Sequence, residues 1–126
     1  MHYLSVEEIL RLHFQVIKDF GGSHGVRDEN RLKSVVDAPR LKVFEHEQYS
    51  SLHEKAAVYV RNIIGDHTFI DGNKRTAVIV GGIFMMRNGS KLRASPKELE
   101  DLAVAVAAEH LDVPAIAAWL KAHSSK

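Results

Sequence analysis

The chain has 126 residues, of which 45% are hydrophobic and 26% are charged, and its formal net charge is +1 at pH 7. This length fits one domain with a real core, spanning residues 1–126, and the balanced charge argues against direct nucleic-acid binding, which would need clustered Lys and Arg. The chain contains no Cys, which excludes disulfides and thiolate metal sites.

The first residues, from Met1 to Ser5, lack a basic region followed by an apolar core, so we expect no signal peptide. No apolar run reaches about 18 residues, so we also expect no membrane span. The default expectation is therefore a cytoplasmic protein.

The first predicted helix begins at a capping box, in which Ser5 is followed three residues later by Glu8. Seven residues then recur every three or four positions, and we expect them to share one apolar face. They are Val6, Ile9, Leu10, His13, Val16, Ile17 and Phe20. Gly21 and Gly22 predict the end of this helix, and His13 is expected to be a hydrogen-bonded histidine of the core.

Residues 21–27 form a predicted loop that contains three glycines and an arginine. The loop either contacts a nucleotide or is a plain turn between two helices, and the turn is the commoner case. Asp28 predicts the N-cap of a short helix, and Pro39 predicts its end. The apolar residues of that helix are Leu32, Val35 and Val36. Residues 40–50 show no clear period and are expected to form an exposed loop.

A second capping box, Ser51 with Glu54, predicts a helix over residues 52–64, and Gly65 fits its C-terminal end. The stretch from about Asn73 to Arg87 predicts another helix, which is apolar on nearly all sides. Such a helix is buried at the centre of a bundle.

Two adjacent glycines, Gly81 and Gly82, interrupt this apolar helix. Each weakens a helix by about 1 kcal/mol relative to Ala, so we expect them to permit close approach of a neighbouring helix. Asn88 and Gly89 predict the helix end rather than a hairpin turn, because the flanking residues do not alternate between polar and apolar.

A third capping box, Ser95 with Glu98, predicts a helix with Pro96 at its first position. Asp112 predicts the start of a last helix, which reaches about Ala122 and contains Trp119 as an expected core anchor. The total of about six helices predicts an all-α, compact single-domain bundle.

Between the two central predicted helices lies a polar stretch, residues 67–75, with the sequence His-Thr-Phe-Ile-Asp-Gly-Asn-Lys-Arg. If a helix begins just after Gly72, its free amides point into this stretch beside Lys74 and Arg75, which is a combination that suits phosphate. Asp71 is a carboxylate that could hold Mg²⁺ next to phosphate groups, and it could instead or in addition be the N-cap of that helix. His67 is a candidate base, because a neutral imidazole can accept a proton at pH 7.

The same stretch matches the pattern H-x-F-x-D/E-G-N-x-R, through which the chain resembles the Fic/Doc family. The matching positions are His67, Phe69, Asp71, Gly72, Asn73 and Arg75. Lys74 departs from the Gly that is typical of Fic AMP-transferases, and in this it resembles the death-on-curing (Doc) toxins. The stretch Gly21 to Asp28 also resembles the Doc branch, and the resemblance implies a compact helical fold.

The resemblance implies a role for each position of the motif. His67 would deprotonate a hydroxyl group of a target protein and Asp71 would hold Mg²⁺. The positions implied to contact ATP are Gly72, Asn73, Lys74 and Arg75. Phe69 is expected to hold the loop against the core. The bulk of Lys74 implies that ATP binds with its γ-phosphate toward His67, so that phosphate is transferred rather than AMP.

The Doc branch also implies a target, a threonine of elongation factor Tu, whose modification stops translation. Many Fic proteins carry a self-inhibitory pattern, S/T-x-x-x-E-G/N, and its nearest match, Ser50 to Glu54, fails because Lys55 follows. Restraint would then come from a separate antitoxin whose binding segment folds on docking. Two alternatives stay open: an AMP-transferase, which Gly72 favours and Lys74 disfavours, and a non-catalytic binding module.

Overall fold

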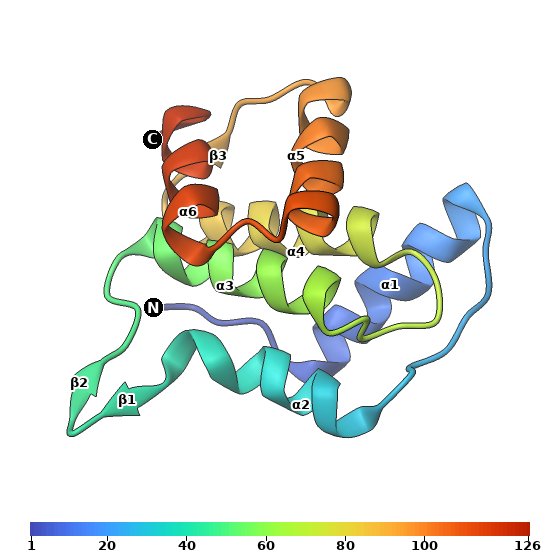
Figure 1. Cartoon of the computed structure of the whole chain (residues 1–126), viewed down its shortest axis with the longest axis horizontal. Coiled ribbons are helices and arrows are strands. Elements are labelled where there is room, and N and C mark those ends of the chain that lie inside the picture. Colours follow the sequence, from blue (N-terminus) through green and yellow to red (C-terminus); the bar gives the residue numbers. More distant parts are fainter.

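The computed structural model describes all 126 residues, and six α-helices make up most of the chain (Figure 1). They are α1 Val6–Phe20, α2 Glu29–Asp37, α3 Leu52–Gly65, α4 Asn73–Arg87, α5 Pro96–Glu109 and α6 Val113–Ala122. The all-α fold class is therefore confirmed. A 3₁₀ turn at Ala38–Arg40 follows α2. Two short antiparallel ribbons complete the fold, β1 Lys42–Val43 with β2 His46–Glu47 and β3 Lys91–Leu92 with β4 Ser124–Ser125.

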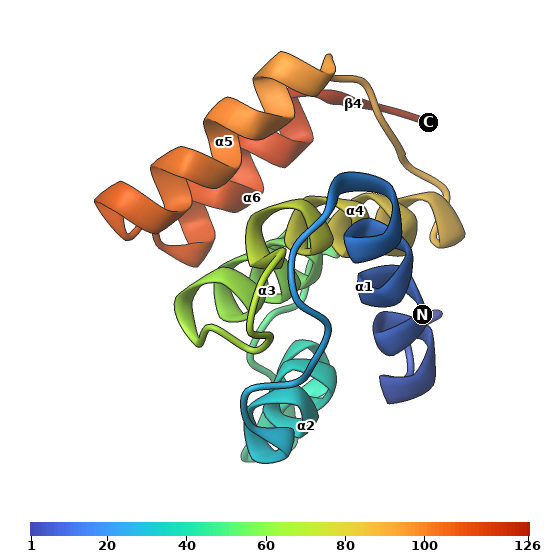
Figure 2. The same cartoon turned by 90° about the vertical axis from the view of Figure 1, so that its right-hand side faces the viewer.

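The pair formed by α3 and α4 lies at the centre of the molecule. In both views α5 and α6 cover one side of this pair and α2 lies on the other, while α1 packs beside α4 (Figures 1 and 2). The helices α3 and α4 touch at Gly81, where an added Cβ would lie 2.8 Å from Val60 Cγ2. This confirms the close helix approach expected at Gly81, whereas Gly82 faces Leu92 of the β3 ribbon instead.

Local sequence signals account for most helix starts. The capping boxes at Ser5, Ser51 and Ser95 are all formed, and Asp28 and Asp112 accept hydrogen bonds as N-caps of α2 and α6. Each such cap stabilises a helix by about 1 kcal/mol. The predicted starts and ends of the helices are therefore confirmed to within one or two residues.

Two residues predicted for the buried face of α1 are exposed. Leu10 is 36% exposed and Phe20 is 58% exposed, whereas the buried residues of α1 are Ile9, His13, Val16 and Ile17. Leu10 is turned by about 100° from Ile9 on a helix with 3.6 residues per turn. Phe20 is the last residue of α1, where the helix extends beyond the core (Figure 1).

The segment predicted as an irregular loop, residues 40–50, is exposed as expected but contains the β1–β2 hairpin. Its turn places Phe44 at φ 50° and Glu45 at φ 67°. Such turns usually carry Asn or Gly, and neither residue type is present here, so the sequence held no hairpin signal. None of the helices combines the length and the apolar character that crossing a membrane requires.

Candidate functional site

The residues predicted for base, metal and nucleotide roles come together around one pocket of about 380 Å³, where α3 ends and α4 begins. We call this the phosphate pocket. Its predicted members are His67, Asp71, Gly72, Asn73, Lys74 and Arg75, and its remaining wall is formed by Ile64, Ile70 and Ala107. A larger hollow of about 610 Å³ lies elsewhere, around Tyr3, Arg40 and Arg87, and contains none of the predicted residues. The smaller pocket is therefore the candidate site.

His67 leaves the end of α3 with its side chain exposed. Its backbone has φ 47°, and its amide donates to the carbonyl of Ile64 at 3.3 Å. This left-handed conformation is a common way to end a helix, and His110 ends α5 in the same way. The imidazole forms no hydrogen bond within the protein, so it is free to act on a ligand.

Asn73 fixes the loop rather than facing the pocket with free polar atoms. Its Oδ1 accepts from the amide of Phe69 at 2.9 Å, and its Nδ2 donates to the carbonyl of the same residue at 2.9 Å. Both polar atoms of the Asn73 side chain are therefore engaged, and the loop between Phe69 and Asn73 is closed into a ring.

Phe69 holds this loop against the core, as the sequence predicted. Its side chain is fully buried and stacks on His13, with the two ring centroids 3.8 Å apart and the planes at 6°. The Nε2 of His13 lies 2.8 Å from the carbonyl oxygen of Asp71. Burial lowers the pKa of His13, although the Asp71 carbonyl partly opposes this effect. A carbonyl can only accept, so Nε2 carries the proton, and the expected hydrogen-bonded core histidine is confirmed.

Gly72 stands where the backbone requires a glycine. Its φ is 77°, and an added Cβ would lie 3.0 Å from Ile17 Cδ1 and 3.4 Å from Val16 Cγ1. Gly72 is also the N-cap of α4, and no side chain caps this helix. The alternative that Asp71 caps α4 is therefore wrong, and the carboxylate is left for other contacts.

Asp71 is held by the glycine-rich loop that connects α1 to α2. The amide of Ser23 donates to Asp71 Oδ2 at 2.8 Å, while Oδ1 has no partner within the protein. The loop also pairs with the motif: Arg27 donates its amide to the carbonyl of Thr68 at 2.9 Å, and Ile70 donates to Gly25 at 3.1 Å. Residues 21–27 are thus a connection between helices that also positions Asp71, and none of them lines the phosphate pocket.

The start of α4 gives the phosphate pocket a positive character. The amides of Asn73, Lys74 and Arg75 belong to the first turn and have no acceptor within the helix. The side chains of Lys74 and Arg75 are exposed, and neither forms an ion pair. The Arg75 guanidinium lies 4.3 Å above the ring centroid of Phe20. Amides, helix dipole and two unpaired cations together favour an anion such as phosphate.

Comparison with known proteins points to one family. The Fic/DOC family model matches residues 3–85, which include the whole motif. The chain is 34% identical over 121 residues to "Protein kinase doc" of Escherichia phage P1, covering 96% of this chain and 94% of that protein. It is 37% identical over 103 residues to "Toxin Doc" of Mycolicibacterium smegmatis, covering 80% of this chain and 79% of that protein.

Proposed function

Since this chain belongs to the Fic/Doc family and is a Doc-type toxin, we propose that it transfers the γ-phosphate of ATP to a hydroxyl group of a target protein. The observation that carries this proposal is the phosphate pocket, which combines a free base, His67, with the amide-rich start of α4 and two unpaired cations. Phosphoryl transfer depends mainly on positioning and on neutralising the charge of the phosphates, and this pocket supplies both.

In the proposed step the target hydroxyl oxygen attacks the γ-phosphorus of ATP. A new oxygen–phosphorus bond forms, the bond between the γ-phosphorus and the bridging oxygen breaks, and ADP leaves with the electron pair. The hydroxyl proton passes to a ring nitrogen of His67. The amides of Asn73 to Arg75 and the side chains of Lys74 and Arg75 bind phosphate oxygens. Asn73 acts through the loop, because its side chain is engaged with Phe69.

The carboxylate of Asp71 fits a magnesium ion bound together with ATP. Mg²⁺ in such sites takes one or two carboxylates and fills its other positions with phosphate and water. Asp71 lines the phosphate pocket, is exposed, and keeps Oδ1 without a protein partner. When bound, Mg²⁺ neutralises phosphate charge. Calorimetric titration of wild type and Asp71→Asn with ATP, with and without Mg²⁺, tests the assignment; an unchanged metal dependence counts against it.

Lys74 favours phosphate transfer over AMP transfer. A long cationic side chain stands where the AMP-transferases typically have glycine, which leaves less room for the terminal phosphates in that half of the site. Gly72 had kept AMP transfer open as an alternative. Its left-handed backbone and its contact with Ile17 account for this glycine without reference to the nucleotide. The presence of Gly72 is therefore not in itself an argument for AMP transfer.

We propose elongation factor Tu as the target, which places the action of this toxin in the cytoplasm, and a cognate antitoxin as its inhibitor. Mass spectrometry of elongation factor Tu after incubation with the protein and Mg-ATP tests the function. The expected product gains one phosphate. A gain of one AMP would show that the protein is an AMP-transferase and not a kinase. If elongation factor Tu stays unmodified while another protein is modified, the proposed target is wrong.

A further inference from the structure

A second pocket, of about 400 Å³, meets the phosphate pocket at His67. It is lined by Asn30, Arg31 and Ser34 of α2 and by Gly65, Asp66 and His67 at the end of α3. His67 is the one residue that lines both pockets. The phosphate pocket reaches toward α5 through Ala107, whereas the second pocket reaches toward α2. These two helices lie on opposite sides of α3 in both views (Figures 1 and 2).

This arrangement suits a group transfer in which the donor and the acceptor meet at the base. The donor phosphates occupy one side of His67, and the acceptor hydroxyl has to reach the ring from a direction that ATP does not fill. In-line attack requires the attacking and leaving oxygens on opposite sides of the phosphorus. Resting on the function proposed above, we infer that the second pocket is an acceptor pocket that binds the hydroxyl-bearing segment of the target protein.

The lining of the acceptor pocket indicates what binds there. Apart from the imidazole of His67, no aromatic side chain lines it, and no aliphatic side chain does. The side chains of Asn30 and Ser34 make no hydrogen bond within the protein, so their donors and acceptors are available to a ligand. These groups match the amides and carbonyls of a peptide backbone and the hydroxyl of Ser or Thr. Beyond the His67 imidazole the pocket offers the ring of a tyrosine no apolar surface to pack on, so the acceptor pocket favours an aliphatic hydroxyl.

Arg31 has both a structural and a binding function in this arrangement. Its Nη1 donates to the carbonyl of Asp66 at 2.8 Å, and its Nε lies 3.9 Å from Asp28 Oδ2. The first contact satisfies a carbonyl at the end of α3 and so supports the backbone next to His67. The contacts also hold the guanidinium at the edge of the acceptor pocket, where its other N–H groups can donate to carbonyl oxygens of the target.

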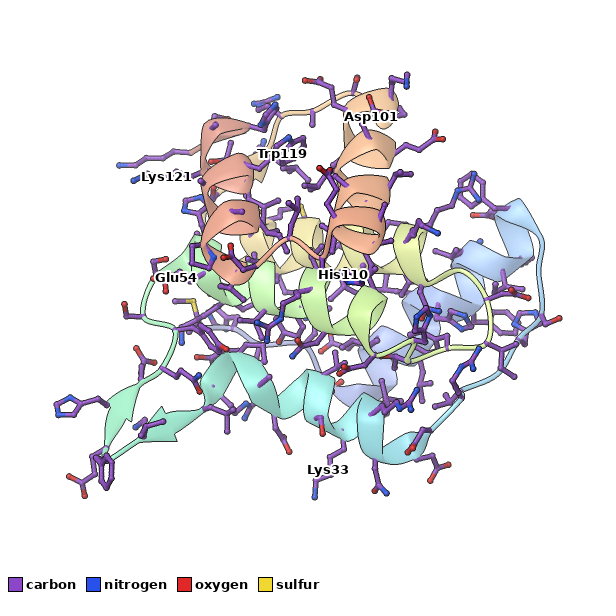
Figure 3. The ribbon with its side chains drawn as sticks, in the orientation of Figure 1. Lys33, Glu54, Asp101, His110, Trp119 and Lys121 are labelled. Atoms are coloured by element: carbon purple, nitrogen blue, oxygen red, sulfur yellow. The ribbon has the colours of Figure 1, made fainter.

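The decisive variant fills the acceptor pocket without removing any internal bond. Ser34→Tyr places a bulky ring in the pocket from an exposed helix position. Lys33→Tyr is the matched control, since Lys33 is the neighbouring exposed residue and points away from the rest of the molecule (Figure 3). Asn30→Ala is a milder second variant that removes one polar group. Circular dichroism establishes that each variant is folded.

The assay follows transfer from γ-labelled and α-labelled ATP to purified elongation factor Tu and to a bacterial lysate freed of nucleotides. We expect Ser34→Tyr to lower kcat/KM for the acceptor at least about tenfold, and Asn30→Ala a few-fold, with the KM for Mg-ATP unchanged. Lys33→Tyr keeps the wild-type values. Wild-type acceptor kinetics in Ser34→Tyr, or an equal loss in Lys33→Tyr, would overturn the acceptor pocket.

The failure of the proposed function gives a different result. If wild type transfers only the α label, the kinase assignment fails while the acceptor pocket is tested with that label in the same variants. If wild type transfers neither label to any protein, the proposed function is wrong, and the role assigned to the acceptor pocket is wrong as well.

Discussion

Replacing Asn73 by Ala should loosen the motif loop and slow transfer while α4 stays intact. The Asn73 side chain forms two hydrogen bonds of 2.9 Å, both with the backbone of Phe69. The backbones of the neighbouring residues Thr68 and Ile70 form hydrogen bonds with the loop of residues 21–27 instead. Without the Asn73 amide, the Phe69 amide and carbonyl lose their partners within the protein.

The size of the effect follows from these two bonds. A hydrogen bond contributes about 1 kcal/mol net, and a partly buried group left unpaired costs about 1–3 kcal/mol. We therefore expect Asn73→Ala to lower the free energy of unfolding by about 2–3 kcal/mol. If about 2 kcal/mol of this is needed to hold His67 and Asp71 in place, the rate of transfer falls roughly 30-fold.

Asn88 provides a matched control at the other end of the same helix. Its side chain donates to the carbonyls of Phe84 and His2 at 2.8 and 3.0 Å, and its Oδ1 accepts from the amide of His2 at 2.8 Å. The two bonds with His2 are exposed to solvent, so water can replace them, and Asn88→Ala should lower the free energy of unfolding by about 1–2 kcal/mol. The rate of transfer should not change, because Asn88 lies far along α4 from the phosphate pocket.

Urea unfolding gives the stability of both variants, and initial rates of phosphate transfer at saturating ATP give their activity. The expected result is a loss of stability in both and a loss of rate in Asn73→Ala alone. Equal rate losses in the two variants would show that general stability, rather than the loop, sets the rate. A full rate in Asn73→Ala would refute the role assigned to the two hydrogen bonds between Asn73 and Phe69.

Three further predictions concern the base, a buried tyrosine and an ion pair. His67→Ala should reduce transfer at least about 100-fold with unchanged urea unfolding, since its exposed ring has no internal bond; a residual rate near wild type excludes His67 as the base. Tyr59→Phe should lower the free energy of unfolding by about 2 kcal/mol, because the buried amide of Leu4 loses its acceptor, the Tyr59 hydroxyl at 3.1 Å; equal stability would mean that water replaces it. The hydrogen bond with Arg87 lowers the pKa of Glu8 to about 2, so ionised Glu8 stabilises the fold above its ordinary value of 4.5, and this contribution disappears as the pH falls from 4.5 toward 2. The free energy of unfolding of wild type should then exceed that of Glu8→Gln by about 1 kcal/mol at pH 7, allowing for the solvent screening of a partly exposed pair. The two values should become equal near pH 2, and a difference that stays constant with pH would contradict this cause.

The helices were predictable because their signals are local. A capping serine and its glutamate lie three residues apart in the chain. The helix starts at Ser5, Ser51 and Ser95 could therefore be predicted without any knowledge of the fold. The exposure of Phe20 was not predictable, since its position on the helix matches the apolar face of α1. Only the placement of α1 against its neighbours leaves this ring outside the core.

The motif could also be predicted from the sequence, but the contacts that support it could not. His67 and Arg75 belong to one short stretch of sequence, and a single loop between two helices brings them to one pocket. The groups that hold this loop, the His13 ring and the Ser23 amide, lie 58 and 48 residues from Asp71 in sequence. A backbone amide leaves no mark on the residue type, so no sequence pattern could have found the contact with Ser23.

The most direct measurement is transfer from ATP labelled separately at the α and γ positions, in wild type and in Lys74→Gly. If Lys74 directs the γ-phosphate toward His67, wild type places only the γ label on its target. Lys74→Gly should lose about a hundredfold of that activity, because one cation at the phosphates is removed. The α label on the target of the wild-type protein would contradict the role of Lys74 and establish AMP transfer instead.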